Sequence, residues 1–178
     1  MDHDEALIRR AQQGDAGAFE QLLESNYETV YRFAYKWCGK QEDAEDITQQ
    51  ACIKLARVLG QFRFESAFSS WLYRLVINCA RDWSRSQRRH TDASEPLQEN
   101  TLQPANGNPV EAQVHRWQLL GQLDQLPDGI KETLLLVHAE GMTHSEAATV
   151  LAVKESTVSW RLHEFRKNFS LLIEREGL

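Results

Sequence analysis

The stretch LPDGIKETLLLVHAEGMTHSEAATVLAVKESTVSWRLHEFRK, residues 126–167, decides the fold of the C-terminal part of the chain. Its apolar spacing predicts helices over about 128–140, 144–151 and 155–173, the last two joined by a tight turn at 152–153. A short helix, a tight turn and a second helix are the layout of a helix-turn-helix, whose second helix enters a DNA major groove. The stretch therefore predicts a DNA-binding motif.

The ends and inner faces of these helices are also readable in the sequence. Gly141 is placed to end the first helix, and Thr143 with Glu146 has the T-x-x-E spacing of a capping box for the second. The residues expected to pack inward are Ile130, Leu134, Leu135 and Val137 in the first helix and Val158, Leu162, Phe165 and Phe169 in the last.

The face of the last helix opposite these apolar positions is polar except for one tryptophan. It carries Ser156, Trp160, His163 and Lys167, flanked by Ser159 and Arg166. An exposed tryptophan is unfavourable unless it has a function, so Trp160 favours a DNA-reading face. His163 is compatible with a phosphate or base contact but does not by itself indicate one. A three-helix bundle that does not bind DNA is the alternative interpretation.

The N-terminal part holds a second informative stretch, DAEDITQQACIKLARVLGQFRFESAFSSWLYRLVINCARDWSRSQRR, residues 43–89. Helices are expected over 3–13, 16–38 and 42–59, and the third has an apolar stripe of Ala44, Ile47, Ala51, Leu55 and Val58. Outside that stripe lie Glu42, Asp43, Glu45, Asp46, Gln49, Gln50 and Lys54. Acids near a helix N-terminus complement the helix macrodipole. They also fit a docking surface for a partner protein, and both interpretations are open.

The next expected helix, over 67–89, carries an arginine-rich stripe. Its inner face is predicted to be Phe68, Leu72, Leu75, Cys79 and Trp83, and the stripe is Trp71, Arg74, Asn78, Arg81, Arg85 and Arg88. Arginines suit phosphates, whereas an amide and an indole suit bases. No acidic residue interrupts the stripe, so we interpret it as a nucleic-acid surface rather than a solvated face, although Trp71 alone would fit a core. The loop GQFRFESA before it offers Phe62, Phe64 and Ser66 to stack on or enclose an unpaired base.

Between the two parts, residues 91–112 are expected to form a flexible acidic linker. This segment holds three of the four prolines, 4 acidic residues and no basic one, whereas residues 61–90 hold 6 arginines against 2 acids. A further helix is expected over 111–125. No stretch reads as a strand, so we expect an all-α protein of two small helical domains, residues 1–90 and 113–178.

The totals exclude several classes of protein. A net charge of −6 argues against a general nucleic-acid coat protein. No apolar run approaches the roughly 20 residues of a membrane span, and MDHDEALIRR lacks a signal-peptide core, so we expect a cytoplasmic protein. Cys38, Cys52 and Cys79 lack the spacing of a metal site. No nucleophile–base pair or phosphate-binding glycine loop is present, so we expect no enzyme, metal or cofactor.

Four segments match one known pattern. Residues 18–19 and 22–32 resemble its first conserved helix, and DAED at 43–46 resembles a helix that docks on the clamp helices of the largest polymerase subunit. FRFESAFSSWLYRL resembles F-R-G-E-S-S-F-x-T-W-L-Y-R-I, and LP…GMTHSEAATVLAVKESTVSWRLHEFRK resembles L-P…G-x-S-Y-x-E-I-A-x-x-L-G-V-x-x-G-T-V-K-S-R-L-H-R-A-R-K. With these four in order around an acidic linker, the chain resembles an extracytoplasmic-function (group IV) sigma factor of bacterial RNA polymerase.

The resemblance implies a sigma-2 helical bundle that docks on core polymerase and recognises and melts the −10 element, and a sigma-4 helix-turn-helix domain that reads the −35 element. By position, the −10 contacts would be Arg63, Phe64, Glu65, Ser66, Trp71, Arg74, Asn78, Arg81, Arg85 and Arg88. The −35 contacts would be Ser156, Thr157, Ser159, Trp160, Arg161, His163, Arg166 and Lys167. The polymerase contacts would be Asp43, Glu45, Asp46, Gln49, Gln50 and Lys54. The implied partners are core RNA polymerase, promoter DNA and an anti-sigma factor.

Three places depart from the family pattern. Phe64 stands where the loop has glycine, Ala152 stands where the turn has glycine, and the pair at 159–160 replaces Lys-Ser. If Ala152 has a positive φ, alanine costs about 1 kcal/mol there relative to glycine.

Two other functions fit part of the sequence: a stand-alone helix-turn-helix regulator that never touches polymerase, and an adaptor that binds only proteins.

Overall fold

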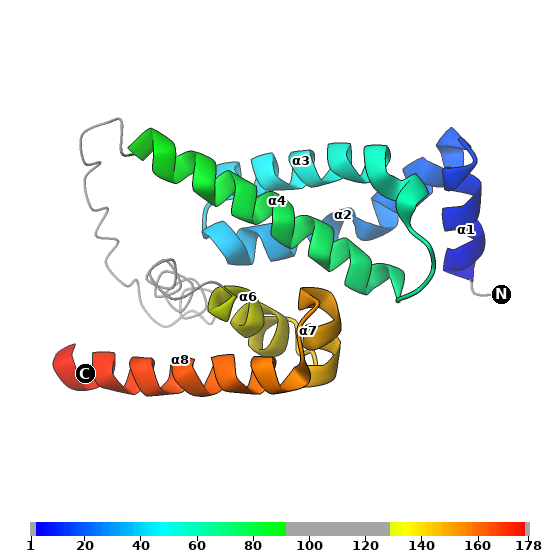
Figure 1. The fold of residues 1–178 in the computed structure, drawn as a ribbon. Coiled ribbons are helices and arrows are strands. Elements are labelled where there is room, and N and C mark those ends of the chain that lie inside the picture. The colour runs from blue at the N-terminus through cyan, green and yellow to red at the C-terminus, as the bar shows by residue number, and fades with distance from the viewer. Residues whose placement is uncertain (1–2, 92–128, 177–178) are drawn as a thin grey trace, which may run out of the picture. The chain divides into compact units, whose positions relative to one another are not determined.

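The computed structural model describes residues 3–91 and 129–176, and all regular structure within these ranges is helical (Figure 1). The prediction of an all-α protein is therefore confirmed. The chain divides into two compact units, Met1–His115 and Arg116–Leu178, hereafter the N-unit and the C-unit.

Several expectations fall outside the described residues. They are the expected linker at 91–112 apart from Thr91, the expected helix at 111–125, and the expected opening of a helix at Leu126 and Pro127.

The N-unit is a bundle of helices. Its elements are α1 (His3–Gln12), α2 (Ala16–Cys38), α3 (Gln41–Val58), the short 3₁₀ helix η1 (Leu59–Gln61) and α4 (Phe68–Thr91). Helix α2 packs on both α3 and α4, while α1 packs on α2 and on η1 (Figure 1). These helices begin and end within two residues of the predicted ranges, because apolar periodicity and turn residues define them jointly.

Local chemistry fixes both ends of α2. The Asp15 carboxylate accepts a hydrogen bond from the Ala18 backbone N–H at 3.0 Å, which caps the helix N-terminus. That bond and the Arg10 guanidinium hold the pKa of Asp15 below its ordinary value. At the other end, Gly39 adopts φ 73°, and its N–H donates to the Tyr35 carbonyl at 2.8 Å.

The core of the N-unit lies where α2, α3 and α4 meet. Phe33 is fully buried, and the Tyr73 ring meets it edge-on at 5.4 Å between centroids. The predicted α3 stripe is buried at Ala44, Ile47, Ala51 and Leu55, as are Leu72, Leu75 and Cys79 of α4. Val58, the last residue of the predicted stripe, is not fully buried. It is half-exposed because the chain leaves α3 for η1 there, and Leu59 is buried instead.

The C-unit contains the predicted helix-turn-helix. Its described elements are α6 (Ile130–Leu134), the π-helical turn η3 (Leu135–Ala139), α7 (His144–Leu151) and α8 (Glu155–Glu176). Helix α8 packs on α6 and α7. Its core contains Ile130, Leu134, Leu135, Ala147, Val150, Val158 and Leu162. The side chain of Phe169 lies outside the described residues, and Phe165 is half-buried.

The turn η3 corrects one prediction. Val137 is half-exposed and Leu136 is fully buried, the reverse of the predicted inner face. The Glu140 N–H bonds to the Leu135 carbonyl at 2.9 Å, a five-residue step that marks a π turn. Such a turn contains more residues than an α turn, so it rotates the following side chains away from the α-helical face. An α-helical period applied to this segment therefore selects the wrong residue.

Candidate nucleic-acid and protein interfaces

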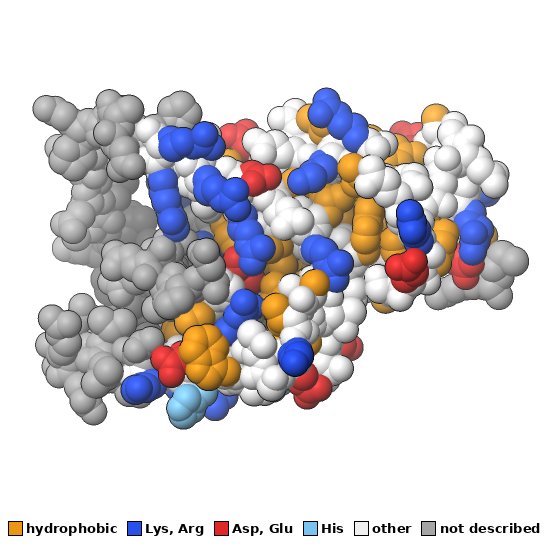
Figure 2. All heavy atoms as spheres, viewed as in Figure 1, with side chains coloured by type: hydrophobic (Ala, Val, Ile, Leu, Met, Phe, Trp, Pro, Cys, Tyr) orange, Lys and Arg blue, Asp and Glu red, His pale blue; other side chains and the backbone are white. Residues whose placement is uncertain are grey.

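The arginine-rich stripe lies on one face of α4, and Figure 2 shows a band of Lys and Arg side chains over this helix. Arg74, Asn78, Arg85 and Arg88 are exposed, and Arg81 is half-buried. The Asp82 carboxylate lies beside the stripe, 3.7 Å from the Arg85 guanidinium in an exposed ion pair. Exposed pairs of this kind are weak. Residues 61–90 hold 6 arginines against 2 acids, so the region of the stripe carries a net positive charge that fits a phosphate backbone.

Four aromatic rings pack together where the preceding loop enters α4, and we call Phe62, Phe64, Phe68 and Trp71 the aromatic cluster. The Phe62 centroid lies 4.8 Å from that of Phe64, 5.5 Å from Phe68 and 5.3 Å from Trp71. Phe62 is only 5% exposed, so the prediction that it stacks on an unpaired base is wrong. Trp71 is half-buried against Phe62 and Phe68, which makes it partly a core residue and partly available at the surface.

Phe64 has an unusual backbone conformation within the aromatic cluster. Its φ is 60°, in the left-handed region, which costs a non-glycine residue about 1–2 kcal/mol. The half-buried ring lies under the Arg9 guanidinium of α1, whose Cζ is 4.1 Å from the ring centroid. The other predicted −10 residues of this loop, Arg63 and Glu65, are exposed, and Ser66 is half-buried.

Helix α3 presents an acidic and amide face to solvent. Glu45, Asp46, Gln49 and Gln50 are exposed, whereas Asp43 and Lys54 are half-buried. Burial raises the pKa of the Asp43 carboxyl. The acids of the first helical turn are Glu42 and Asp43, and the dipole interaction fades beyond that turn. Complementing the macrodipole therefore does not account for Asp46, and a docking role remains for this face.

Sequence reasoning missed one residue of this face. Ile53 is 47% exposed, and it lies seven residues after Asp46 and three after Gln50, on the same side of α3. An exposed isoleucine beside amides fits a surface that becomes covered by a protein partner. Its position off the apolar stripe of α3 was the signal available in the sequence.

The outward face of α8 is exposed as the sequence predicts. Ser156, Ser159, Trp160, His163, Arg166 and Lys167 are exposed, with Trp160 at 55%. Thr157 and Arg161 are half-buried. The Arg161 guanidinium lies so close to Gly129 that a Cβ there would overlap it, so this arginine faces back toward the start of α6. It therefore lies apart from the exposed row.

Helix α7 supports the same face. The His144 Nδ1 atom lies 3.0 Å from the Ser159 Oγ atom, which connects the start of α7 to α8. The capping box is present, because the Thr143 hydroxyl accepts from the Glu146 N–H and the Glu146 carboxylate accepts from the Thr143 N–H. The bonds that the Glu146 carboxylate accepts from the Thr143 backbone N–H and from the Thr143 hydroxyl hold the pKa of Glu146 below its ordinary value. Ala152 then turns the chain with φ 53°, so the condition under which alanine costs about 1 kcal/mol relative to glycine is met.

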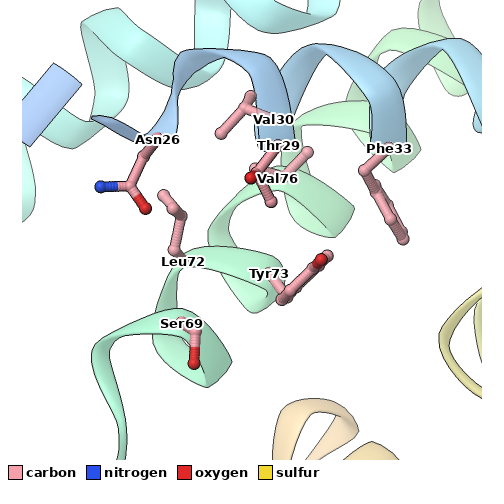
Figure 3. A pocket seen from close by; sticks show the side chains of 8 residues that line it. All are labelled: Asn26, Thr29, Val30, Phe33, Ser69, Leu72, Tyr73 and Val76. Carbon is pink, nitrogen blue, oxygen red and sulfur yellow. The ribbon is translucent and has the colours of Figure 1, made fainter. Parts of the chain in front are cut away.

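A small hollow lies between α2 and α4 in the N-unit (Figure 3). Its volume accessible to water is only about 20 Å³. It is lined by Asn26, Thr29, Val30, Phe33, Ser69, Leu72, Tyr73 and Val76. This lining has no carboxylate, imidazole or amine to act as an acid or base. No cluster of His, Cys, Asp or Glu side chains among the described residues could hold a metal ion. In the same residues no helix is long and apolar enough to cross a membrane.

Comparison with known proteins identifies both units. The Sigma-70 region 2 model matches residues 22–90, and the Sigma-70 region 4 model matches residues 116–168. The RNA polymerase sigma factor NccH of Alcaligenes xylosoxydans xylosoxydans is 30% identical over 176 residues, which cover 96% of this chain and 95% of NccH. The ECF RNA polymerase sigma factor SigE of Mycolicibacterium smegmatis is 32% identical over 162 residues, which cover 86% of this chain and 62% of SigE.

The chain belongs to the extracytoplasmic-function sigma factors of RNA polymerase. As a member of this family it is an alternative sigma factor that directs promoter-specific transcription initiation with RNA polymerase, and sigma factors are not enzymes. A stand-alone helix-turn-helix regulator and a protein-only adaptor are both wrong, because the N-unit also matches a sigma-factor region.

A solved structure shows the same fold. The sigma factor RpoE of Bartonella quintana, in complex with the anti-sigma factor NepR, is 21% identical to this sigma factor with a TM-score of 0.64. The match covers 88% of this chain and 96% of RpoE. The two helical domains of the prediction are therefore the architecture of this family.

Proposed function

We propose that the two units divide promoter recognition between them. The N-unit contacts and opens the −10 element through α4 and the loop before it, and the C-unit reads duplex −35 DNA through α8. The observation that carries this proposal is the exposed stripe on α4, which combines arginines with Asn78 and lies on a helix separate from the acidic face of α3. Residues 1–90 and 113–178 would be the working domains, with residues 91–112 as their tether.

Within the N-unit the stripe has two kinds of task. Four arginines of α4 hold the phosphate backbone. Arg74, Arg85 and Arg88 are exposed, and Arg81 is half-buried. Asn78 offers an amide to a base edge, and Arg63, Glu65 and Ser66 border the unpaired base. Trp71 is half-buried against Phe62 and Phe68, and a base can stack on the part of its indole that they leave uncovered.

Within the C-unit the exposed row of α8 enters the major groove. Trp160 supplies apolar contact to base edges, Arg166 can form a bidentate contact with guanine, and Ser156 can bond a base or a phosphate. Ser159, His163 and Lys167 lie in the same row and suit phosphates or base edges. Thr157 and Arg161 are half-buried, so we assign them supporting rather than reading roles.

The exposed face of α3 is the proposed docking surface for core polymerase. It contains Glu45, Asp46, Gln49 and Gln50, flanked by half-buried Asp43 and Lys54, and Ile53 adds an apolar contact. An apolar residue surrounded by polar ones is the composition of a protein–protein interface. Since core polymerase works in the cytoplasm, we place this sigma factor there.

An anti-sigma factor is the further partner that we propose. RpoE of Bartonella quintana shares the fold and is solved in complex with the anti-sigma factor NepR, which supports a regulator of this type here. No cofactor enters the proposal.

The test is a promoter selection with reconstituted holoenzyme. Core polymerase and this protein are incubated with a pool of randomised promoters, and templates that give run-off transcripts are sequenced. The Asn78→Ala variant should change the selected −10 bases only, and Trp160→Ala should change the selected −35 bases only. Arg32→Ala, an exposed arginine of α2 outside every proposed surface, is the control and should change neither. Changes at the same element in both variants would contradict the division.

A further inference from the structure

Helix α1 makes several contacts with the loop that precedes α4. The Gln12 side-chain amide donates to two backbone carbonyls of that region, Leu59 at 3.0 Å and Phe62 at 2.8 Å. One turn earlier, the Arg9 guanidinium lies over the Phe64 ring at 4.1 Å. The two side chains lie three residues apart, and therefore on one face of α1, and both reach the segment 59–64.

These contacts matter because of the conformation that they hold. Phe64 has φ 60°, in the left-handed region. Glycine adopts a positive φ without strain, whereas phenylalanine needs surrounding contacts to keep it there. Within the described parts of the chain, Phe64 has no backbone hydrogen bond of its own that would supply this support. The ring contacts with Arg9 and Phe62 supply it instead.

Arg9 is itself oriented by a neighbour on α1. The Glu5 carboxylate accepts hydrogen bonds from the Arg9 Nε and Nη2 atoms, at 3.0 and 2.6 Å. The Arg9 side chain is exposed and that of Glu5 is half-buried, and an ion pair at the surface adds little stability. Its effect is geometric, because two hydrogen bonds from one guanidinium to one carboxylate oxygen restrict where the guanidinium plane can lie.

We propose that α1 acts as a clamp on residues 62–67, the loop between η1 and α4, which we call the −10 loop. Arg9 and Gln12 would be positioning residues that set the shape of this loop without touching DNA. The inference rests on the proposed role of the loop as a −10 contact. The matched sigma-70 region 2 segment begins at residue 22, so the clamp lies outside it. The base preference of this sigma factor at the −10 element therefore depends on a helix that precedes the matched region.

The first measurement concerns the protein alone and needs no DNA. Amide hydrogen exchange is followed in the full chain and in Arg9→Met, which keeps an extended side chain but loses the charge over the ring. Exchange across residues 59–66 should become roughly 2–5-fold faster in the variant, the factor expected when one exposed cation–π contact is lost. Arg10→Met is the matched control, because the Arg10 guanidinium bonds to Asp15 and not to the loop. Unchanged exchange in Arg9→Met overturns the clamp.

The second measurement concerns base preference. Open-complex formation by the holoenzyme is compared on templates that differ at single −10 bases, with −35 substitutions as an internal reference. Arg9→Met should change discrimination at the −10 element by roughly 2–5-fold and leave −35 discrimination unchanged. Gln12→Met should act in the same direction. In the Phe64→Gly background, Arg9→Met should have no further effect, because glycine needs no support there and offers no ring.

The outcomes separate the clamp from the proposed function. Faster exchange, altered −10 discrimination and loss of the Arg9 effect in the glycine background support the clamp. If Phe64→Gly alters −10 discrimination and Arg9→Met does not, positioning by α1 is overturned and the −10 role of the loop stands. If exchange quickens and neither variant alters −10 discrimination, the loop is not a −10 contact, and the proposed role fails together with the inference.

Discussion

Phe64 in the N-unit and Ala152 in the C-unit are both non-glycine residues with a positive φ, 60° and 53°. They are supported differently. The Ala152 N–H bonds to the Ala148 and Thr149 carbonyls, and the next N–H, that of Val153, bonds to Ala148. Phe64 depends on side chains from a distant helix. The turn of the helix-turn-helix is therefore held by its own backbone, whereas the −10 loop is held by tertiary contacts and can be tuned by substitutions elsewhere.

We expect the largest effect, a loss of core-polymerase binding, from a substitution on the exposed face of α3, which includes neither of these two turns. Asp46→Arg reverses a charge on the exposed face of α3, so we expect loss of core-polymerase binding while both turns keep their structure. Pull-down by core polymerase measures the binding, and circular dichroism checks the fold. The matched control is Glu24→Arg, a charge reversal at an exposed residue of α2. Undiminished core binding by folded Asp46→Arg would remove the docking role of α3.

The next effect sharpens the contrast between the turns. Phe64→Ala keeps the strained backbone and removes the ring, whereas Phe64→Gly removes both the strain and the ring. We expect Phe64→Ala to lower the free energy of unfolding of the N-unit by about 1–2 kcal/mol relative to Phe64→Gly. Urea unfolding measures the difference. Equal stability of the two variants would mean that the loop relaxes once the ring is absent, so that Phe64 does not maintain a strained turn.

A smaller gain is expected in the C-unit. Ala152→Gly should raise the free energy of unfolding by up to about 1 kcal/mol, because glycine adopts the left-handed conformation without the Cβ clash. The −35 preference should not change, since the backbone hydrogen bonds of the turn remain. Thermal unfolding together with promoter selection tests both parts. A shift in −35 preference would show that this turn is tunable as well, and the contrast with Phe64 would disappear.

The smallest effects concern pH, with one helix cap in each unit. The folded pKa values of Asp15 and Glu146 lie below their ordinary values of 3.8 and 4.5. Each carboxylate therefore stabilises its unit fully above the ordinary value, and this stabilisation is lost as the pH falls through the folded pKa. Asp15→Asn and Glu146→Gln should flatten the fall in unfolding free energy between about pH 5 and 3. If the unfolding free energy of either variant fell with pH as it does in the unsubstituted protein, the carboxylate of that cap would contribute no pH-dependent stability.

The parts of the fold that follow local rules were predictable from the sequence. The capping box at Thr143 and Glu146, the turn at Ala152 and the apolar stripe of α3 each depend on residues within a few positions of one another. The errors have non-local or irregular causes. Val137 was misplaced because a π turn changes the helical phase. Phe62 was assigned to a base contact because nothing in a short loop shows that its ring lies inside an aromatic cluster.

The candidate interfaces were predictable to a similar degree. The exposed rows of α4 and α8 follow from periodicity alone. The contacts that shape them do not, since Arg9 is 55 residues from Phe64 and His144 is 15 residues from Ser159. Arg161 was placed in the DNA-reading row because sequence cannot show that its guanidinium lies against Gly129. Ile53 was overlooked because an apolar residue off the core stripe carries no obvious charge signal.

The proposal that the N-unit opens the −10 element and the C-unit reads the −35 element is tested most directly by measuring holoenzyme recruitment and strand opening separately. Filter binding measures closed-complex formation by the holoenzyme on duplex promoter, and permanganate footprinting measures unpaired thymines at the −10 element. Asn78→Ala should bind the duplex almost normally and lose permanganate reactivity. Arg166→Ala should weaken recruitment by about 1–3 kcal/mol, if the contact reads a base edge, and open normally once bound. Lost recruitment in Asn78→Ala together with lost opening alone in Arg166→Ala would reverse the assignment of the two units and contradict the account.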